Sequence, residues 1–527
     1  MRNVAAGGLT NLLENQPTRA RRASWLCSVV LSLGLLASAC GSTGTGHAAG
    51  AAGGSGKSVV IATVGSISNL DPLLGNDRAL DTAEQMVSFN VYEPLLRRNA
   101  QGVLQPDLAT SLPTQMGGNT WQFKLRHGVE FSNGVPFSAA AVVDTIKTVL
   151  NKTFSSSWYD RVSSITAVTA VDNYTVDVQT NGFDPNVPSE LSLIDIVPPG
   201  YVQHLSTLQR APIGTGPYIL KSISSAGDMA VLERNPHYWG TTPAVSQVTV
   251  KQIDDDQTRL AALQSGGADI ITDVPPDLAS SLPAVAVNQS IENSGILFNA
   301  LAGVTANQNV RIALNLALDK NTMVAKLYNK YAQVSNCQYT SAGSTGYDPH
   351  LKPYPYDPAK ARALLQSAGA IGKTIDLETA SDYAHGRQVV ESVASYWEAV
   401  GLKVNIVISP HASFIGDIFK GRQRPAAMFV LAGDDLRDAS QTNRFFATGL
   451  SLSAYSNPQL DSLYKQASNA QSPSNRTALL EQVEKFACDQ ALIGFLWNSL
   501  YIDGHRSGLN MIPRQEGWIY FPEISFK

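Results

Sequence analysis

The sequence predicts an α/β fold divided into two or three lobes. Short stretches rich in Val, Ile and Tyr alternate along the chain with amphipathic stretches of helical period. The composition, with 44% hydrophobic and 16% charged residues, is that of an ordinary globular protein. The roughly 470 residues after position 57 exceed what one hydrophobic core usually organises, so we expect more than one lobe.

The clearest local unit lies at residues 374–409. Residues 374–379 and 402–409 have the composition of strands, and residues 386–400 between them have a helical period. Strand, helix and strand of these lengths predict a βαβ unit. We expect Gly401 to cap the helix, whose core-facing stripe consists of Val389, Val390, Val393, Tyr396, Trp397 and Val400. Similar helices are expected at residues 309–319, 357–367 and 476–490.

Residues 1–39 have the layout of a signal peptide. Basic residues, Arg21 and Arg22 among them, precede an apolar run that is too short for a transmembrane helix of about 20 residues. The segment Leu-Ala-Ser-Ala-Cys that ends at Cys40 resembles a bacterial lipobox, which implies that Cys40 is lipidated and anchors the protein to the cell membrane. Residues 40–57, rich in Gly, Ala, Ser and Thr, predict a flexible tether. Both the general secretory and the twin-arginine export routes stay open.

Cysteine usage agrees with export. Cys27 leaves with the signal peptide and Cys40 is taken by the lipid, so Cys337 and Cys488 remain. An even pair in an oxidising compartment predicts one disulfide, and two buried free thiols are the alternative.

Charge and motifs exclude several functions. The chain carries a net charge of −4 and no arginine-rich run, whereas nucleic-acid binders are basic. It contains neither the His-Glu-x-x-His nor the Gly-x-Ser-x-Gly pattern of common hydrolases, so we expect no enzyme, no catalytic residue and no cofactor. The acidic run at residues 254–256 is interpreted as a helix start, where the helix dipole favours carboxylates, and not as a metal site.

A series of short motifs occurs in a characteristic order between residues 58 and 527. The most distinctive is the segment at residues 121–134, Trp-Gln-Phe-Lys-Leu-Arg-His-Gly-Val-Glu-Phe-Ser-Asn-Gly. The others are Leu70-Asp71-Pro72, Tyr92-Glu93-Pro94-Leu95-Leu96, Pro106-Asp107-Leu108-Ala109, Gly214-Thr215-Gly216-Pro217-Tyr218 and Asn235-Pro236-His237-Tyr238-Trp239. In this order they resemble the extracellular solute-binding proteins of family 5, which includes the peptide and nickel binders of ABC importers.

The resemblance implies a two-lobed clamshell of the class II periplasmic-binding-protein type, with the solute closed between the lobes by hinge motion. We place lobe I at residues 58–300 plus 496–527, with an extra subdomain inserted at about 75–205. Lobe II then comprises residues 301–495. A monomer is expected, working with the permease and ATPase subunits of an importer.

The resemblance also implies a ligand site at residues 426–435, an apolar strand that ends in carboxylates. In peptide-binding relatives the edge of this strand pairs with the peptide backbone, a role that would fall here to residues 430–433, Val430, Leu431, Ala432 and Gly433. An Asp just after the strand holds the α-amino group, and Asp434 matches it by position. Asp435 and Asp438 are the alternatives, because this chain departs from the usual motif there.

Further ligand contacts are expected from other segments. Ser66 and Ser68 match the contact segment of the first lobe. Tyr383 and Arg387, with His385 between them, follow a predicted strand and suit the mouth of a cleft. The resemblance favours peptides, from dipeptides to oligopeptides. A nickel chelate, haem or a sugar on the same fold is the alternative, as is a sensor or chaperone-like receptor.

Overall fold

The computed structural model describes residues 57–527 except 75–81, 155, 157, 202–204, 382, 384 and 451. The signal peptide, Cys40 and the tether up to residue 56 lie outside the described residues. Lys57, the last residue assigned to the tether, opens the first strand instead.

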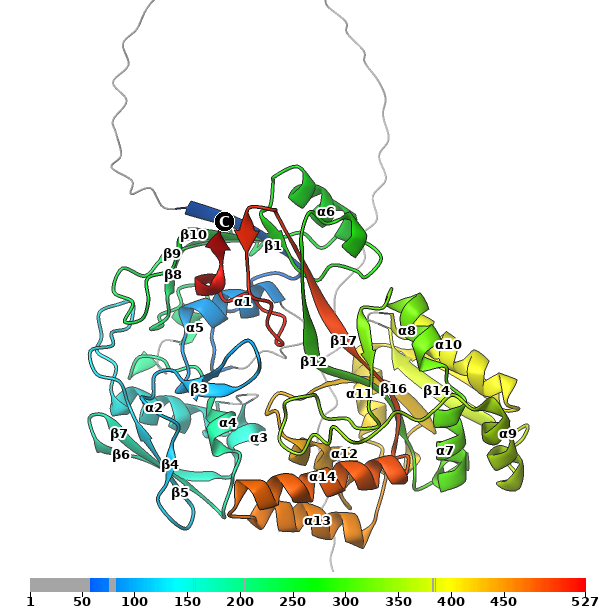
Figure 1. Ribbon diagram of the computed structural model, residues 1–527. Helices are drawn as coiled ribbons and strands as arrows, with labels where there is room; N and C mark the ends of the chain where they lie inside the picture. Colours follow the sequence, from blue (N-terminus) through cyan, green and yellow to red (C-terminus); the bar gives the residue numbers. More distant parts are fainter. Residues whose placement is uncertain are drawn as a thin grey trace, which may run out of the picture. The chain divides into compact units, whose positions relative to one another are not determined.

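One large mixed sheet forms the centre of the described part, in which most strands pair with neighbours distant in sequence (Figure 1). In spatial order its strands are β15 (Lys403–Ser409), β14 (Thr374–Ala380), β16 (Ala427–Gly433), β12 (Val285–Phe298), β17 (Ile493–His505), β11 (Ile270–Ile271), β1 (Lys57–Thr63), β10 (Val245–Gln252), β9 (Met229–Arg234) and β8 (Tyr218–Ile223), and β13 (Ala332–Val334) pairs with β17.

Smaller sheets complete the β structure. A four-stranded sheet has the order β4 (Thr114–Gln115), β5 (Thr120–Lys124), β7 (Thr175–Thr180), β6 (Ile165–Asp172). Two further pairs are β2 (Leu96–Arg98) with β3 (Leu104–Pro106) and β18 (Leu509–Asn510) with β19 (Ser525–Phe526).

The helices lie between these strands along the chain. They are α1 (Thr82–Val91), α2 (Ala139–Val149), α3 (Tyr159–Val162), α4 (Val187–Leu191), α5 (Leu205–Leu208), α6 (Asp256–Gln264), α7 (Gln308–Leu316), α8 (Lys320–Leu327), α9 (Pro358–Ser367), α10 (Gly386–Ala399), α11 (His411–Ile418), α12 (Asn443–Phe446), α13 (Pro458–Asn469) and α14 (Pro473–Asp489). Within the described residues, none of them has the length and apolar character that crossing a membrane requires.

The predicted βαβ unit is confirmed. β14 and β15 pair in parallel along their whole length, and α10 connects them. Five residues of the stripe predicted to face the core are buried, namely Val389, Val390, Val393, Trp397 and Val400, whereas Tyr396 is half-buried and packs against Tyr356. Local periodicity was sufficient here because one face of the helix covers the sheet.

Side-chain caps explain two helix boundaries. Asp255 precedes α6 and accepts a hydrogen bond from the Thr258 N–H at 2.8 Å, which confirms the acidic run as a helix start. The helix expected at residues 309–319 is wrong at its end, because α7 stops at Leu316. Asp319 instead caps the next helix by accepting from the Thr322 N–H at 3.1 Å.

Strands β12 and β17 connect two groups of buried side chains. One group extends from Val59 to Ile270 and includes Phe521 and Ile524 near the C-terminus. A second group extends from Ile296 to Trp497. β12 and β17 lie side by side (Figure 1), and their pairing is interrupted between Gln289 and Asn293, midway along both strands. The lobe and subdomain boundaries proposed from the sequence stay predictions.

The C-terminal tail returns to α1. The side chain of Asn90 donates to the Ile519 carbonyl at 2.9 Å and accepts from the Phe521 N–H at 2.8 Å. This anchoring places residues 516–518 beside the cavity described next.

Candidate functional site

A cavity of about 930 Å³ is lined by residues of strands β12 and β17 and of chain segments that lie before, between and after them in the sequence. Residues between 82 and 195 and residues 516–518 form one part of its wall, and residues between 383 and 452 form another. The strands between these parts also contribute lining residues, namely Ile291 and Glu292 from β12 and Tyr501 from β17. Asp273, which lies between β11 and β12 in the sequence, completes the lining. Ile291 and Glu292 belong to the interruption in the β12–β17 pairing. The cavity therefore combines segments that are far apart in the sequence, from Thr82 to Trp518.

Strand β16 lines this cavity and pairs with β12 along one of its two edges. In an antiparallel pair, every second residue directs its N–H and C=O toward the partner strand. The Asp434 N–H donates to the Ile291 carbonyl at 3.1 Å, which fixes the alternation. The backbone groups of Val430 and Ala432 are thus engaged with β12, which corrects the expectation that these two residues offer their backbone to a ligand.

The backbone groups of Leu431 and Gly433 point toward the other edge. On that edge β14 pairs with Ala427 and Met428 and then diverges. In the described part of the chain, no strand pairs with this edge beyond Met428. Leu431 and Gly433 both line the cavity, so an open strand edge faces it.

Asp434 does not belong to the residues that line the cavity. Its side chain is buried, at 5% exposure, and one carboxylate oxygen accepts from the Asp438 N–H and the Gln441 amide, each at 3.0 Å. The other oxygen accepts from the Ser341 N–H at 3.2 Å and from the Ser344 hydroxyl. Burial raises the pKa of Asp434 although these hydrogen bonds favour the charged form. Both oxygens of Asp434 are thus engaged within the protein, which corrects the expectation that this carboxylate binds the amino group of a ligand.

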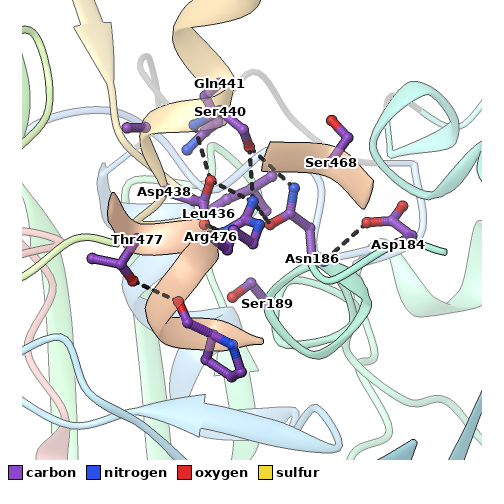
Figure 2. Close-up of polar contacts among 12 residues, drawn as sticks. Asp184, Asn186, Ser189, Leu436, Asp438, Ser440, Gln441, Ser468, Arg476 and Thr477 are labelled. Atoms are coloured by element: carbon purple, nitrogen blue, oxygen red, sulfur yellow. Dashed lines mark hydrogen bonds and ion pairs between the residues drawn. The ribbon is translucent and has the colours of Figure 1, made fainter. Parts of the chain in front are cut away.

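Asp438 is also engaged within the protein. It is buried and forms an ion pair with Arg476 of α14, with Nη2 of the arginine 2.8 Å from Oδ1. Figure 2 shows Asn186, just before α4, reaching this pair. Asn186 accepts from Arg476 Nη2 at 3.1 Å and donates to the Ser440 hydroxyl at 3.2 Å. The network joins α4, which packs in the first group of buried side chains, to α14.

Asp435 does line the cavity, where it pairs with an arginine from another part of the wall. Arg161 Nη2 lies 2.7 Å from Asp435 Oδ2, and Arg161 Nη1 donates to Gln441 at 3.1 Å. Both charged side chains keep partial exposure, 27% for Arg161 and 36% for Asp435.

Most other charged groups of the wall also have partners. Arg97 pairs with Asp107 at 2.8 Å, and Arg98 and Arg437 donate to the backbone carbonyls of Leu436 and Ala342. Asp273 accepts from the Thr272 hydroxyl at 2.8 Å, and Glu516 lies 3.6 Å from Arg514.

Glu292 and Arg444 differ from these groups. Both are half-buried and line the cavity. Neither the carboxylate nor the guanidinium forms a hydrogen bond or ion pair with another residue that the structure describes. Burial, together with the charges of Asp435 and Asp273, raises the pKa of Glu292. Burial and the charge of Arg161 lower the pKa of Arg444.

The remaining predicted site residues divide between the cavity and the surface. Tyr383 lines the cavity and packs against Phe414. Arg387 is 64% exposed and lies 3.7 Å from Glu391, away from the cavity. His385 and the two serines of the first-lobe segment lie outside the lining too. Ser68 is exposed and donates to Glu84.

Cys337 and Cys488 form a disulfide with their Cα atoms 5.4 Å apart. It connects the loop that contains Ser341 and Ser344 to the end of α14. The described residues contain no cluster of three or more His, Cys, Asp or Glu side chains arranged to hold a metal ion.

Sequence reasoning missed Glu292, Arg444 and the aromatic wall formed by Phe89, Trp158 and Trp518. Only Glu292 carried a signal in the sequence. It is a charged residue inside a long run that is otherwise apolar or uncharged, residues 285–298, and such a residue in a central strand requires a partner or a function.

Known proteins are similar to this chain over much of its length. Residues 103–451 match the model of the bacterial extracellular solute-binding proteins, family 5. The nickel-binding periplasmic protein of Escherichia coli K12 is 33% identical over 306 residues, which cover 55% of this chain and 58% of that protein. The glutathione-binding protein GsiB of the same strain is 26% identical over 448 residues, or 81% and 86% of the two chains.

Solved structures agree on the fold. NikA from Brucella suis, in complex with Fe(III)-EDTA, superposes with a TM-score of 0.78 at 25% identity, over 89% of this chain and all of that one (100%). DppA from Helicobacter pylori, in complex with the peptide STSA, gives a TM-score of 0.73 at 22% identity, over 89% and 98% of the chains. These likenesses confirm the predicted two-lobed fold.

Proposed function

We propose, from the premise that this chain belongs to the bacterial extracellular solute-binding proteins of family 5, that it captures short peptides in the cavity and delivers them to an ABC importer. The family consists of substrate-binding transport proteins and not of enzymes. Its relatives are named for nickel and for glutathione, and one structural neighbour holds a peptide. The chemistry of the cavity must therefore decide between these solutes.

The open edge of β16 carries the proposal. A peptide is the class of solute that presents alternating N–H and C=O groups, and it can add to such an edge as a further strand whatever its side chains are. The free groups of Leu431 and Gly433 face the cavity and have the spacing of this pairing. A volume of about 930 Å³ lies at the upper end of the usual range for small-molecule sites, which suits a short peptide.

Calorimetry and thermal-shift measurements on residues 57–527 test this function. Pools from dipeptides to octapeptides should raise the melting temperature, because a ligand that binds only the folded state stabilises it by mass action. Methylating single backbone nitrogens of a bound peptide should weaken binding at least about tenfold at the positions that pair with β16. If only a nickel chelate, haem or a sugar binds, or if methylation has no effect at any position, the peptide proposal fails.

We also propose that the protein is exported, lipidated at Cys40 and held at the cell membrane as a monomer by the tether. The support is the order of basic residues, apolar run, small residues and Cys in the first 40 positions. A Cys40→Ser variant should move from the membrane fraction to the soluble fraction. Equal membrane association of the variant would contradict lipid anchoring.

A further inference from the structure

The charges of the cavity wall show which groups a solute must complete. Among the described lining residues, the other arginines have hydrogen-bond or ion-pair partners within the protein, whereas Arg444 has neither and lies over the Phe445 ring. Glu292 is the corresponding case among the carboxylates. A charge withdrawn from water is costly unless an opposite charge or a hydrogen-bond donor compensates it. The cavity therefore contains one negative and one positive group without a partner in the described part of the chain, and a solute that carries both charges could form an ion pair with each.

Their placement relates both groups to the open strand edge. Glu292 lies opposite Gly433 in the β12–β16 pairing, at the end of the free edge. Arg444 belongs to α12, which follows the same strand. The charge of Asp435 acts on both of them, because it contributes to the raised pKa of Glu292 and counteracts the lowering of the pKa of Arg444. Asp435 itself is compensated by Arg161 and is not available in the same way.

We infer that Glu292 binds a cationic nitrogen group of the solute and that Arg444 binds an anionic group, so that the cavity selects zwitterionic solutes. For a peptide these groups are a free amine and a free carboxylate. This inference rests on the proposed function for its choice of peptides as probes. The charge selection itself extends to any solute that carries both groups.

Trialanine, N-acetyl-trialanine and trialanine amide are suitable probes, measured by calorimetry on the wild-type protein, Glu292→Gln and Arg444→Gln. Glu292→Gln should lose at least tenfold in affinity for trialanine and little for the acetylated peptide. Arg444→Gln should lose at least tenfold for trialanine and little for the amide. Glu391→Gln and Arg387→Gln are matched controls, since this exposed pair lies outside the cavity, and both should bind like the wild type.

Thermal unfolding without ligand separates a binding role from a structural one. Removing an unpaired, half-buried charge should leave the melting temperature unchanged or raise it, whereas loss of a structural contact would lower it. Wild-type affinity for trialanine in either variant overturns the inference, as does a loss of affinity that only accompanies a lower melting temperature. If trialanine does not bind the wild type but a free amino acid does and needs both residues, the charge selection stands and the peptide function fails.

Discussion

Replacing Glu484 by Gln should remove a pH-dependent part of the folding stability. Glu484 lies on α14, is 1% exposed and accepts hydrogen bonds from the Tyr339 N–H and the Thr340 hydroxyl. Burial raises its pKa from 4.5 to about 7. Between these values the folded protein keeps a proton that the unfolded chain releases, so the stabilisation is complete below pH 4.5 and is lost as the pH rises toward 7. The difference of about 2.5 units corresponds to roughly 3 kcal/mol.

Urea unfolding at several pH values checks this reasoning. Because a glutamine side chain cannot ionise, the Glu484→Gln variant should gain about 3 kcal/mol relative to the wild type between pH 4.5 and pH 7.5, whatever its stability at the lower pH. Glu391→Gln, at an exposed position on α10, should follow the wild-type curve. Parallel curves for the wild type and Glu484→Gln across this range would refute the protonated, buried state of Glu484.

Three further predictions concern the disulfide, the Asn186 network and the close packing at Gly214. Replacing Cys337 and Cys488 together by Ala should lower the melting temperature by roughly 5 °C. The 151-residue separation predicts a loss of roughly 5 kcal/mol, and a chain of roughly 470 residues unfolds with an entropy of about 1 kcal/mol per degree, so an unchanged midpoint in calorimetry would contradict this. Asn186→Ala loses two hydrogen bonds to the α14 network and should weaken solute binding roughly tenfold by disfavouring closure. An unchanged dissociation constant would show that the network does not hold the closed form. Gly214→Ala should cost about 3 kcal/mol, because its Cβ would lie 2.0 Å from a backbone carbonyl oxygen, whereas Gly182→Ala, in open space, should cost far less in urea unfolding.

The sequence predicted those parts of the fold that depend on neighbours along the chain. The βαβ unit and the cap at Asp255 follow from periods and side chains within a few residues. The order of strands in the large sheet does not, since β12 and β17 pair across about two hundred positions. The Gly214–Gly216 motif shows the same limit. The structure requires these glycines because the chain passes directly over the carbonyl of Val91, which is more than a hundred positions earlier in the sequence.

Only some of the residues expected at the candidate site face the cavity. Leu431 and Gly433 direct free backbone groups toward it, whereas the backbone of Val430 and Ala432 and the carboxylate of Asp434 are engaged within the protein. Which backbone groups of residues 430–433 face the cavity depends on the pairing with β12, and a shift of one residue reverses the answer. Motif position likewise pointed to Asp434. Its burial depends on Ser341 and Ser344, about ninety residues earlier, which no local pattern reveals. Arg444 could not be predicted from the sequence, because it differs from the other arginines of the wall only in having no hydrogen-bond or ion-pair partner among the described residues.

The contribution of residues 516–518 to the cavity wall has a consequence for the order of synthesis. The chain is made from its N-terminus, and the first wall residues, on α1, precede the last by more than four hundred positions. No nascent or truncated chain that lacks the segment around Trp518 can have a complete cavity, however well its earlier lobes have folded. A solute can therefore be enclosed by the whole wall only after this segment has been made, and a deletion that includes residues 516–518 removes part of that wall.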